Sequence, residues 1–338
     1  MNENLEKLAV NYMQKLIKSL ACHLKGIRTD EDIENLHQVR VVTRRLGNAL
    51  QVFSSCFAAP KIKFWQKELR RCRRRLGQAR DRDVHIAFLH EIVQTLDNRS
   101  HRPGLTRLIL RLDQERKKLQ PKVLKSVQQF THSKVLEDMY GQISRMEIAA
   151  SHAEPAPDDI QIYKKAQKHI VGCLDDLMSY EDSLHQPDAV NEHHKMRIAA
   201  KKLRYQMEVF LPAYDDTFLS FLKIVKTFQT YLGNIHDYDI WAELLTKFEK
   251  REYRRTVRYY GSDRPFRRLR TGIRYFQDYC CQERKRIFSE FVNCWEQIGE
   301  EGFSAGLREV LQDRIKRCRT QDVIPDIILN SDISSSEN

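Results

Sequence analysis

The sequence predicts an all-α protein, and three observations lead to that prediction. Apolar residues recur at the three- and four-residue spacing of amphipathic helices along almost the whole chain of 338 residues. Glycine and proline, which supply the turns of β-sandwiches and barrels, number only 12 and 9. The hydrophobic fraction of 41% is ample for a packed core, which argues against a disordered chain. We therefore expect long helices joined by short connections.

The apolar spacing places these helices in chain order. The first helix is outlined by Leu5, Leu8, Tyr12, Leu16 and Leu20. Pro60 and the Arg102-Pro103-Gly104 step then separate helices expected at 32–57, 61–77, 82–97, 103–130 and 133–150. Segment 151–159 is short, polar and proline-bearing, so we interpret it as a linker. Helices follow at 160–181, 188–211, 215–232, 238–260, 265–298 and 303–318, and a polar tail covers 321–338.

Two motifs occur twice, in the same order. The sequence HQVRVVTRRL begins at His37, and HKMRIAAKKL begins 157 positions later at His194. LGQARDRDV begins at Leu76, and LGNIHDYDI begins 156 positions later at Leu232. A weaker repeat pairs QERKK at Gln114 with QERKR at Gln282. The period is too long for a solenoid, so we predict two related helical halves, residues 1–150 and 151–320.

Positive charge is concentrated in the repeated segments. The chain has 58 Lys and Arg against 46 Asp and Glu, a formal net charge of +12. The window from His37 to Arg80 holds 12 basic residues and one acid, a charge of +11. The window from His194 to His236 holds seven basic residues and three acids, a charge of +4. The remainder of the chain is therefore slightly acidic, and the first half is the more basic one.

The basic residues form stripes on helix faces. At about 100° per residue, His37, Arg40 and Arg44 lie opposite the apolar face of their helix. Similar stripes contain His194, Arg197, Lys201 and Arg204 in the second half, and Lys63, Lys67, Arg70 and Arg74 on the next helix of the first. Like charges at this spacing cost a few tenths of a kcal/mol per pair, about as much as opposite charges contribute. We expect a multivalent anion to relieve this repulsion. The alternative is a basic, solvated surface without a ligand.

The repeated histidines and aspartates have a structural and a functional interpretation. An anion beside His37 and His194 would favour protonated imidazoles that donate to phosphate oxygens. No carboxylate or cysteine shares their stripe, so we do not expect a metal site. Four aspartates follow the Leu-Gly pairs, and we expect Gly77 and Gly233 to end helices that these aspartates then cap. Alternatively, one Asp of each pair orients a stripe cation; the four are Asp81, Asp83, Asp237 and Asp239.

Several protein classes are disfavoured by the sequence. No stretch approaches the roughly 18 uncharged apolar residues of a membrane span. The N-terminal residues lack the pattern of a signal peptide. Eight cysteines are scattered without a C-x-x-C pair, which is typical of reduced thiols. The chain also lacks the common nucleotide-binding, zinc-protease and serine-hydrolase motifs. We expect a cytoplasmic protein without a cofactor.

The doubled pattern H-x-x-R-x-x-x-[RK]-[RK]-L followed by L-G-x-x-x-D-x-D-[VI] resembles the CHAD family, the conserved histidine α-helical domain, over residues 5–320. This resemblance implies two four-helix-type bundles related by a pseudo-twofold, with basic helix faces meeting at a central cavity. It also implies binding of inorganic polyphosphate and association with polyphosphate granules. The positions that match are His37, Arg40, Arg44, Arg45, Lys67, Arg70, His194, Arg197, Lys201, Lys202, Arg204, Lys223 and Lys226.

The candidate site adds Lys63 and Arg74 from the basic face of the first half. Its symmetry is incomplete, because Gly47 stands where the second half has Arg204, and Thr227 and Thr230 thin the second stripe. The acidic E-x-E-x-K motif of the CYTH triphosphatases, to which this domain is sometimes fused, is absent. The stripes also lack carboxylates to hold a divalent metal. We therefore expect polyphosphate, or another multivalent phosphate anion, to be bound without catalysis.

Three alternatives stay open. Basic helices also bind nucleic-acid backbones, although single-strand binders usually interleave aromatic residues with the basic groove. Such a mixture occurs near the C-terminus, where Tyr253, Tyr259, Tyr260 and Tyr275 lie among Arg251, Arg254, Arg255, Arg258 and Arg274. The second alternative is an enzyme that processes triphosphate or polyphosphate. The third is a helical scaffold whose basic faces contact only water.

Overall fold

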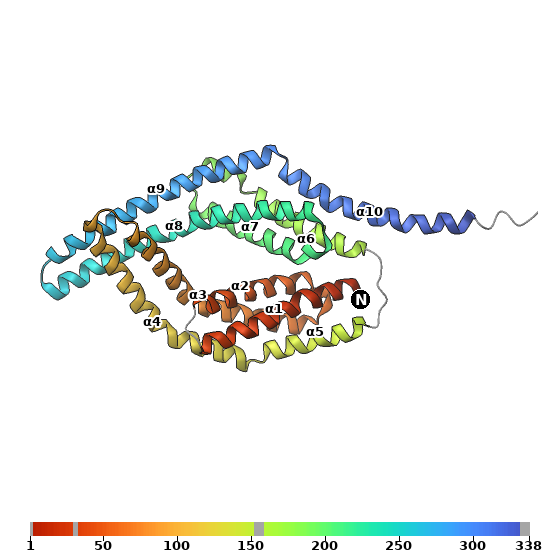
Figure 1. The fold of residues 1–338 in the computed structure, drawn as a ribbon, viewed down its shortest axis with the longest axis horizontal. Helices are drawn as coiled ribbons and strands as arrows, with labels where there is room; N and C mark the ends of the chain where they lie inside the picture. Colours follow the sequence, from red (N-terminus) through yellow and green to blue (C-terminus); the bar gives the residue numbers. More distant parts are fainter. Residues whose placement is uncertain (1–2, 30–32, 152–158, 332–338) are drawn as a thin grey trace, which may run out of the picture.

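The computed structural model describes residues 3–29, 33–151 and 159–331, and every regular element in these ranges is a helix (Figure 1). The all-α prediction is therefore confirmed. The helices of the first half are α1 (Glu3–Thr29), α2 (Ile33–Val52), α3 (Ala59–Gln94), α4 (Arg102–His132) and α5 (Val135–Ser151). Those of the second half are α6 (Ile160–Met178), α7 (Val190–Phe210), α8 (Asp216–Tyr260), α9 (Arg264–Glu300) and α10 (Phe303–Ser331).

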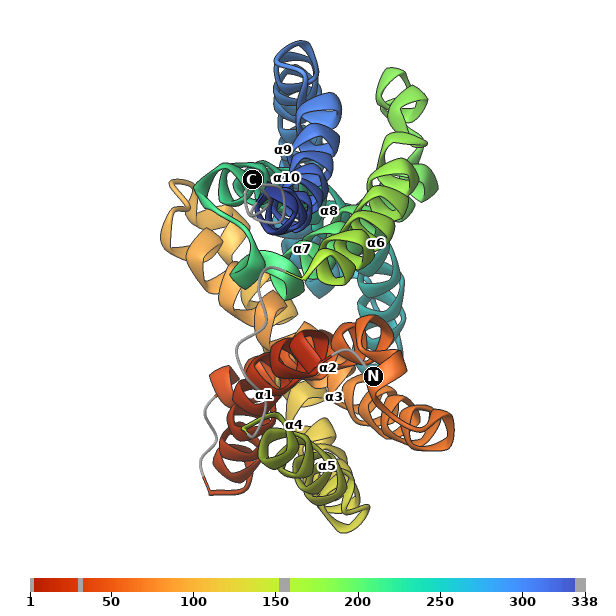
Figure 2. The same ribbon diagram turned by 90° about the vertical axis from the view of Figure 1, so that its right-hand side faces the viewer.

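The two halves pack their helices in the same order. α1 contacts α2 and α5, just as α6 contacts α7 and α10. Each half then continues through its next two helices, with α2 against α3 and α3 against α4 in the first, and α7 against α8 and α8 against α9 in the second. Figure 2 shows the halves as two groups of helices, one above the other. The duplication seen in the sequence thus corresponds to two similarly assembled bundles.

Equivalent helices meet across the interface between the halves. α2 contacts α7, and α4 contacts α9. At the far end, a Cβ added to Gly104 would lie 2.3 Å from the carbonyl oxygen of Leu269, and one added to Gly272 would lie 2.0 Å from that of His101. The backbones of α4 and α9 therefore touch, which only glycine permits. The pseudo-twofold relation itself stays a prediction, and contacts between equivalent helices are what it requires.

The apolar stripes predicted from the sequence form the core. Val39, Leu46 and Leu50 of α2, and Phe53 directly after this helix, are all fully buried. One large cluster of buried residues includes parts of both bundles. A second cluster joins the far ends of α3, α4, α8 and α9, and Leu89, Leu108, Trp241 and Phe276 belong to it. The basic faces on the opposite sides of α2 and α7 are consequently left for solvent or for a ligand.

The expected helix breaks at Gly77 and Gly233 are wrong, because α3 and α8 run through both glycines without interruption. Packing against neighbouring helices keeps these segments helical in spite of the glycines. Gly77 makes room for a side chain, because a Cβ there would lie 2.7 Å from Nη1 of Arg40. The capping role of the four motif aspartates is also wrong, since all four lie inside helices.

The chain boundaries differ in part from those expected. Of the predicted linker, residues 152–158 lie outside the described residues, as do residues 332–338 of the predicted tail. Helix α10 extends to Ser331, so the first part of that tail continues a helix. All eight cysteines are free thiols. Across the described parts of the chain, no helix combines the length and the apolar character needed to cross a membrane.

Candidate functional site

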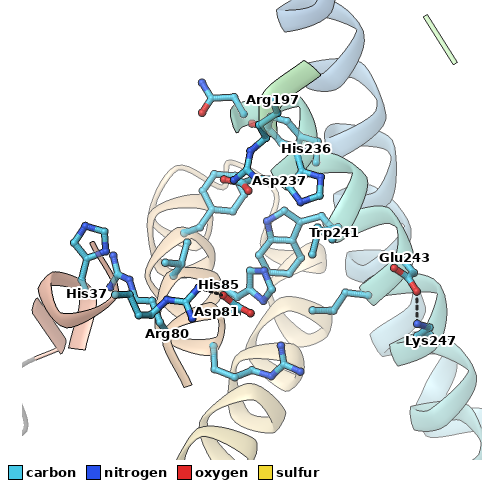
Figure 3. Close-up of a pocket in the computed structure, with 18 of the residues that line it drawn as sticks. His37, Arg80, Asp81, His85, Arg197, His236, Asp237, Trp241, Glu243 and Lys247 are labelled. Carbon is cyan, nitrogen blue, oxygen red and sulfur yellow. Dashed lines mark hydrogen bonds and ion pairs between the residues drawn. The ribbon is translucent and has the colours of Figure 1, made fainter. Parts of the chain in front are cut away.

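A cleft of about 1110 Å³ lies between the two halves (Figure 3). Helices α2 and α3 form one wall, and α7 and α8 form the other. Basic side chains dominate its polar lining. They are His37, Arg40, Arg44, Arg80, Arg82 and His85 from the first half, and Arg197, Lys201, His236, Lys247, Lys250, Arg251 and Arg254 from the second. Three carboxylates, those of Asp81, Asp237 and Glu243, also line the cleft.

The structure brings five of the predicted site residues together in this cleft: His37, Arg40, Arg44, Arg197 and Lys201. A sixth, His194, is not part of the lining but contacts a residue that is. Its Nδ1 is 3.2 Å from Nδ1 of His236, which lines the cleft. Of the two motif histidines, His37 therefore lines the cleft directly, whereas His194 is linked to it through His236.

Three other predicted site residues are paired with carboxylates outside the lining. Arg45 and Arg204 come from opposite halves, and their guanidiniums lie 3.2 and 3.6 Å from Glu208. The Glu208 carboxylate thus joins α2 to α7. Lys202 donates to Asp176 at 3.1 Å on the surface of the second half. These three cations have structural partners and are less available to a ligand.

The remaining predicted residues are exposed and lie outside the cleft. They are Lys63, Lys67, Arg70 and Arg74 on α3, and Lys223 and Lys226 on α8. In their place the structure supplies Arg80 and His236, which occupy equivalent positions inside the second repeated motif. The sequence contained this signal, but the helix breaks expected at Gly77 and Gly233 concealed that these residues continue the basic face.

Arg40 is held in position by three contacts. Its Nη1 donates to the carbonyl oxygen of Arg73 at 3.0 Å, and its Nη2 lies 3.9 Å from Asp81. Its guanidinium also lies against Gly77. Burial lowers the pKa of Arg40, while Asp81 acts in the opposite direction. One aspartate of the first pair therefore accompanies a stripe cation, as the alternative interpretation of the motif expected.

The second wall has a lysine with an unusually low affinity for its proton. Burial, followed by the charges of Arg197, Arg44 and Arg204, lowers the pKa of Lys201 from 10.5 to about 7. Arg44 comes from the opposite half, so the two walls repel each other electrostatically. Asp237 opposes this effect on both Lys201 and Arg197. One carboxylate does not compensate a cluster of this size, so the cleft has an excess of positive charge.

Burial and the neighbouring cations also lower the pKa values of the histidines in and beside the cleft. Burial and then Arg80 lower the pKa of His37, and burial and then Arg197 lower that of His194. The pKa of His236 falls to about 4, mainly through burial. The sequence predicted protonated imidazoles beside an anion, whereas the cleft by itself favours the neutral forms. Protonation of these histidines would therefore depend on the negative charge of a bound ligand.

The other aspartate of each motif connects neighbouring helices. Asp83 accepts from Arg116 at 2.6 Å, which ties α3 to α4. Asp239 accepts from Arg284, which ties α8 to α9 in the same manner. These arginines are the equivalent residues of the weak Gln-Glu-Arg-Lys repeat. Both aspartates thus help to hold the helices that form the cleft walls.

Metal-binding chemistry finds little support in the cleft. Within the described ranges, no group of three or more His, Cys, Asp or Glu side chains could hold a metal ion. The three cleft carboxylates are each placed beside a cation. Asp81 lies near Arg40, Asp237 acts on Arg197, and Glu243 accepts from Lys247. The arrangement is suited to binding an anion through many charge-assisted hydrogen bonds.

Comparison with known proteins identifies the family and the fold of this chain. The CHAD domain family model matches residues 11–246. The fold is similar to the crystal structure of the CHAD domain from the plant Ricinus communis, with a TM-score of 0.60 and 17% identity over 90% of this chain and 91% of that chain. It is also similar to PptA from Streptomyces chartreusis, with a TM-score of 0.54 and 15% identity over 86% of this chain and 99% of that chain.

Identities this low establish a shared fold and no more. Among curated proteins, no sequence matches significantly. The family model, by contrast, covers well over half of the chain and includes both copies of the two motifs. The chain therefore belongs to the CHAD domain family.

Proposed function

We propose that the cleft binds inorganic polyphosphate and does so without catalysis. The CHAD family is linked to polyphosphate and triphosphate binding. The observation that carries the proposal is the convergence of Arg40 and Arg44 with Arg197 and Lys201 in one cleft. Burial, followed by the charges of Arg197 and Arg44, lowers the pKa of Lys201 to about 7. A chain of phosphates would supply negative charge to both walls at once. Arginine guanidiniums suit this role because they donate two parallel hydrogen bonds to phosphate oxygens.

The aromatic residues of the cleft favour phosphate over nucleic acid. Trp241 is buried and packs against His85, with ring centroids 4.5 Å apart. Phe88 packs against Trp241 and Tyr238 in the second core cluster. These rings contact one another and leave few faces for stacking bases, which single-strand binders need. A polymer without bases places no such demand on the cleft.

The C-terminal tyrosines are the observation that favours nucleic acid as a second candidate. Tyr259 and Tyr260 are exposed at the end of α8, near Arg255 and Arg258 in sequence. Tyr275, in contrast, is stacked on His101 with ring centroids 4.1 Å apart. A nucleic-acid surface here would lie at the tip of the α8–α9 hairpin and would leave the function of the cleft unchanged.

A competition experiment distinguishes the two ligands. Long-chain polyphosphate and single-stranded nucleic acid of matched charge are titrated against the protein at two salt concentrations. We expect polyphosphate to bind more tightly and to keep this advantage at the higher salt concentration, because buried charge pairs are screened less than exposed ones. Equal displacement by nucleic acid would overturn the assignment.

Incubation with triphosphate and Mg²⁺ or Mn²⁺ tests the absence of catalysis. We expect no release of phosphate, because the cleft carboxylates lie beside cations and form no metal-binding group. Release that depends on the metal and on Arg197 would identify an enzyme. Binding without turnover would suit a protein that is targeted to polyphosphate granules in the cytoplasm, which co-localisation with granules in cells would test.

A further inference from the structure

The cleft continues along α8 as a row of cations. Lys247, Lys250, Arg251 and Arg254 line its far part, and Arg258 follows one turn later. Their spacing places these side chains on one face of the helix. At about 1.5 Å per residue, this cation row extends roughly 16 Å along the helix axis.

A shared carboxylate links the cation row to the first half of the cleft. Glu115 of α4 accepts from Arg82 at 2.9 Å and from Arg251 at 3.4 Å. Arg82 is close in sequence to Arg80, whose charge acts on both His37 and Arg40. Arg80 and Arg82 of α3 therefore lie between the cluster around Arg40 and Arg251 at the beginning of the row. The two basic regions form one path.

The end of α8 that bears the cation row is firmly attached to the first half. The carboxylate of Glu252 is only 1% exposed and accepts from Arg107 at 3.1 Å and from Arg111 at 3.0 Å. Lys250, Arg254 and Arg258, by contrast, are exposed. Among the described residues, no carboxylate lies within ion-pair distance of these three. Their charges are thus held in place but not neutralised.

The cation row exists only in the second half. The residues 156 positions before Lys247, Lys250, Arg251 and Arg254 are Glu91, Gln94, Thr95 and Asn98. Helix α3 ends at Gln94, whereas α8 continues to Tyr260. The row also begins directly after residue 246, where the match to the family model ends. The row therefore has no counterpart in the first half and calls for a separate explanation.

Building on the proposed function, we propose that one long polyphosphate chain occupies the cleft and the cation row together, so that the protein selects long chains over triphosphate. A triphosphate can fill the cluster around Arg40 and Lys201 but cannot also reach Arg258. Each further phosphate–cation contact releases a counterion and strengthens binding. Contacts within one chain also avoid the cost of a second association.

The test compares two ligands and two variants with equal charge. The row variant carries Lys250→Gln, Arg254→Gln and Arg258→Gln. The control variant carries Arg264→Gln, Arg268→Gln and Arg274→Gln, which removes three exposed charges from α9 outside the cleft. We expect the row variant to lose about tenfold or more in affinity for long-chain polyphosphate, with a salt slope smaller by about three. The affinity of the row variant for triphosphate should change by no more than about twofold. The same limit should hold for the affinities of the control variant for triphosphate and for long-chain polyphosphate.

The possible results separate this inference from the proposed function. If the native protein binds triphosphate and long chains with the same affinity and the same salt slope, the row is not used, although the cleft function stands. If the row variant loses binding while neutralisation of Arg197 and Lys201 has no effect, the polymer lies on the row alone and joint occupancy is wrong. If neither ligand binds the native protein, the proposed function fails together with the inference.

Discussion

The two walls of the cleft occupy equivalent positions but differ in how they respond to pH. The first half contributes Arg40, Arg44 and Arg80, all with guanidiniums that keep their charge at any physiological pH. The second half has Arg197, Lys201 and His236 at the same three positions. Two fixed charges are thus replaced by titratable ones. The equivalent positions of both repeats line the cleft, while the replacement of two arginines makes the second wall the more sensitive to protons.

This difference alters the charge of the empty cleft. With a pKa of about 4, His236 is neutral at pH 7, and Lys201, with a pKa of about 7, is only partly charged. A bound polyanion would raise both pKa values, so binding would take up protons at these two residues of the second wall as well as at His37 of the first.

Removing the charge from both walls should have the largest effect. The variant with Arg40→Gln, Arg44→Gln, Arg197→Gln and Lys201→Gln should lose about a hundredfold or more in polyphosphate affinity, because each of these cations would donate charge-assisted hydrogen bonds to the bound phosphates. Its matched control replaces Lys63, Lys67, Arg70 and Arg74 with glutamine, and should lose only about threefold through reduced long-range attraction. Fluorescence titration measures both. If both variants lost the same affinity, the exposed face of α3 that bears Lys63, Lys67, Arg70 and Arg74 would be part of the binding surface.

The pH dependence of binding is the next largest effect, and above pH 7 it comes mainly from Lys201 of the second wall. Because the free pKa of Lys201 is about 7 and a bound anion raises it, affinity should fall as the pH rises above 7. The decrease should reach at most about tenfold per pH unit until the pKa of the bound state is passed. Lys201→Arg should flatten this part of the profile, whereas Arg44→Lys should steepen it. A profile unchanged by Lys201→Arg would contradict the assignment.

Lys201 should also lower the stability of the empty protein. Its folded pKa lies below the ordinary value of 10.5, so the unfolded chain binds more protons between pH 7 and 10.5. The destabilisation is therefore complete below pH 7 and disappears as the pH rises towards 10.5. Lys201→Met should raise the free energy of unfolding by on the order of 1 kcal/mol at pH 6, with a smaller gain at pH 9. Lys202→Met, next to it on the surface, should give no such gain in denaturant unfolding.

Gly77 and Gly233, which occupy equivalent positions in the two halves, allow a test with the smallest expected effect. Gly77→Ala would place a Cβ 2.7 Å from the Arg40 guanidinium, so it should displace that group and lower affinity by about threefold. At Gly233, no atom lies within 4 Å of an added Cβ. Gly233→Ala should therefore stabilise α8 by roughly 0.5–1 kcal/mol without changing affinity. Identical behaviour of the two variants would remove Gly77 from the description of the site.

The sequence predicted the helical fold, the inward and outward faces of α2 and α7, and the five stripe residues that meet in the cleft. Those features follow from helical periodicity, which is local. It did not predict that Glu208 would pair with Arg45, because that contact joins helices far apart in the chain. The pair of Arg204 with Glu208 lies within α7 at i,i+4 spacing, so it was a local signal that the stripes of basic residues did not include. The sequence also placed helix ends at Gly77 and Gly233, where local glycine signals are outweighed by tertiary packing. Arg80 and His236 were missed for the same reason.

The central claim is that cations from both halves bind the same phosphate chain. A crystal structure of the complex with triphosphate at pH 6 tests this claim most directly. We predict phosphate density between the guanidiniums of Arg40 and Arg44 on one side and the side chains of Arg197 and Lys201 on the other. Density confined to a single wall, or lying on the outward face that bears Lys67 and Arg70, would contradict the account.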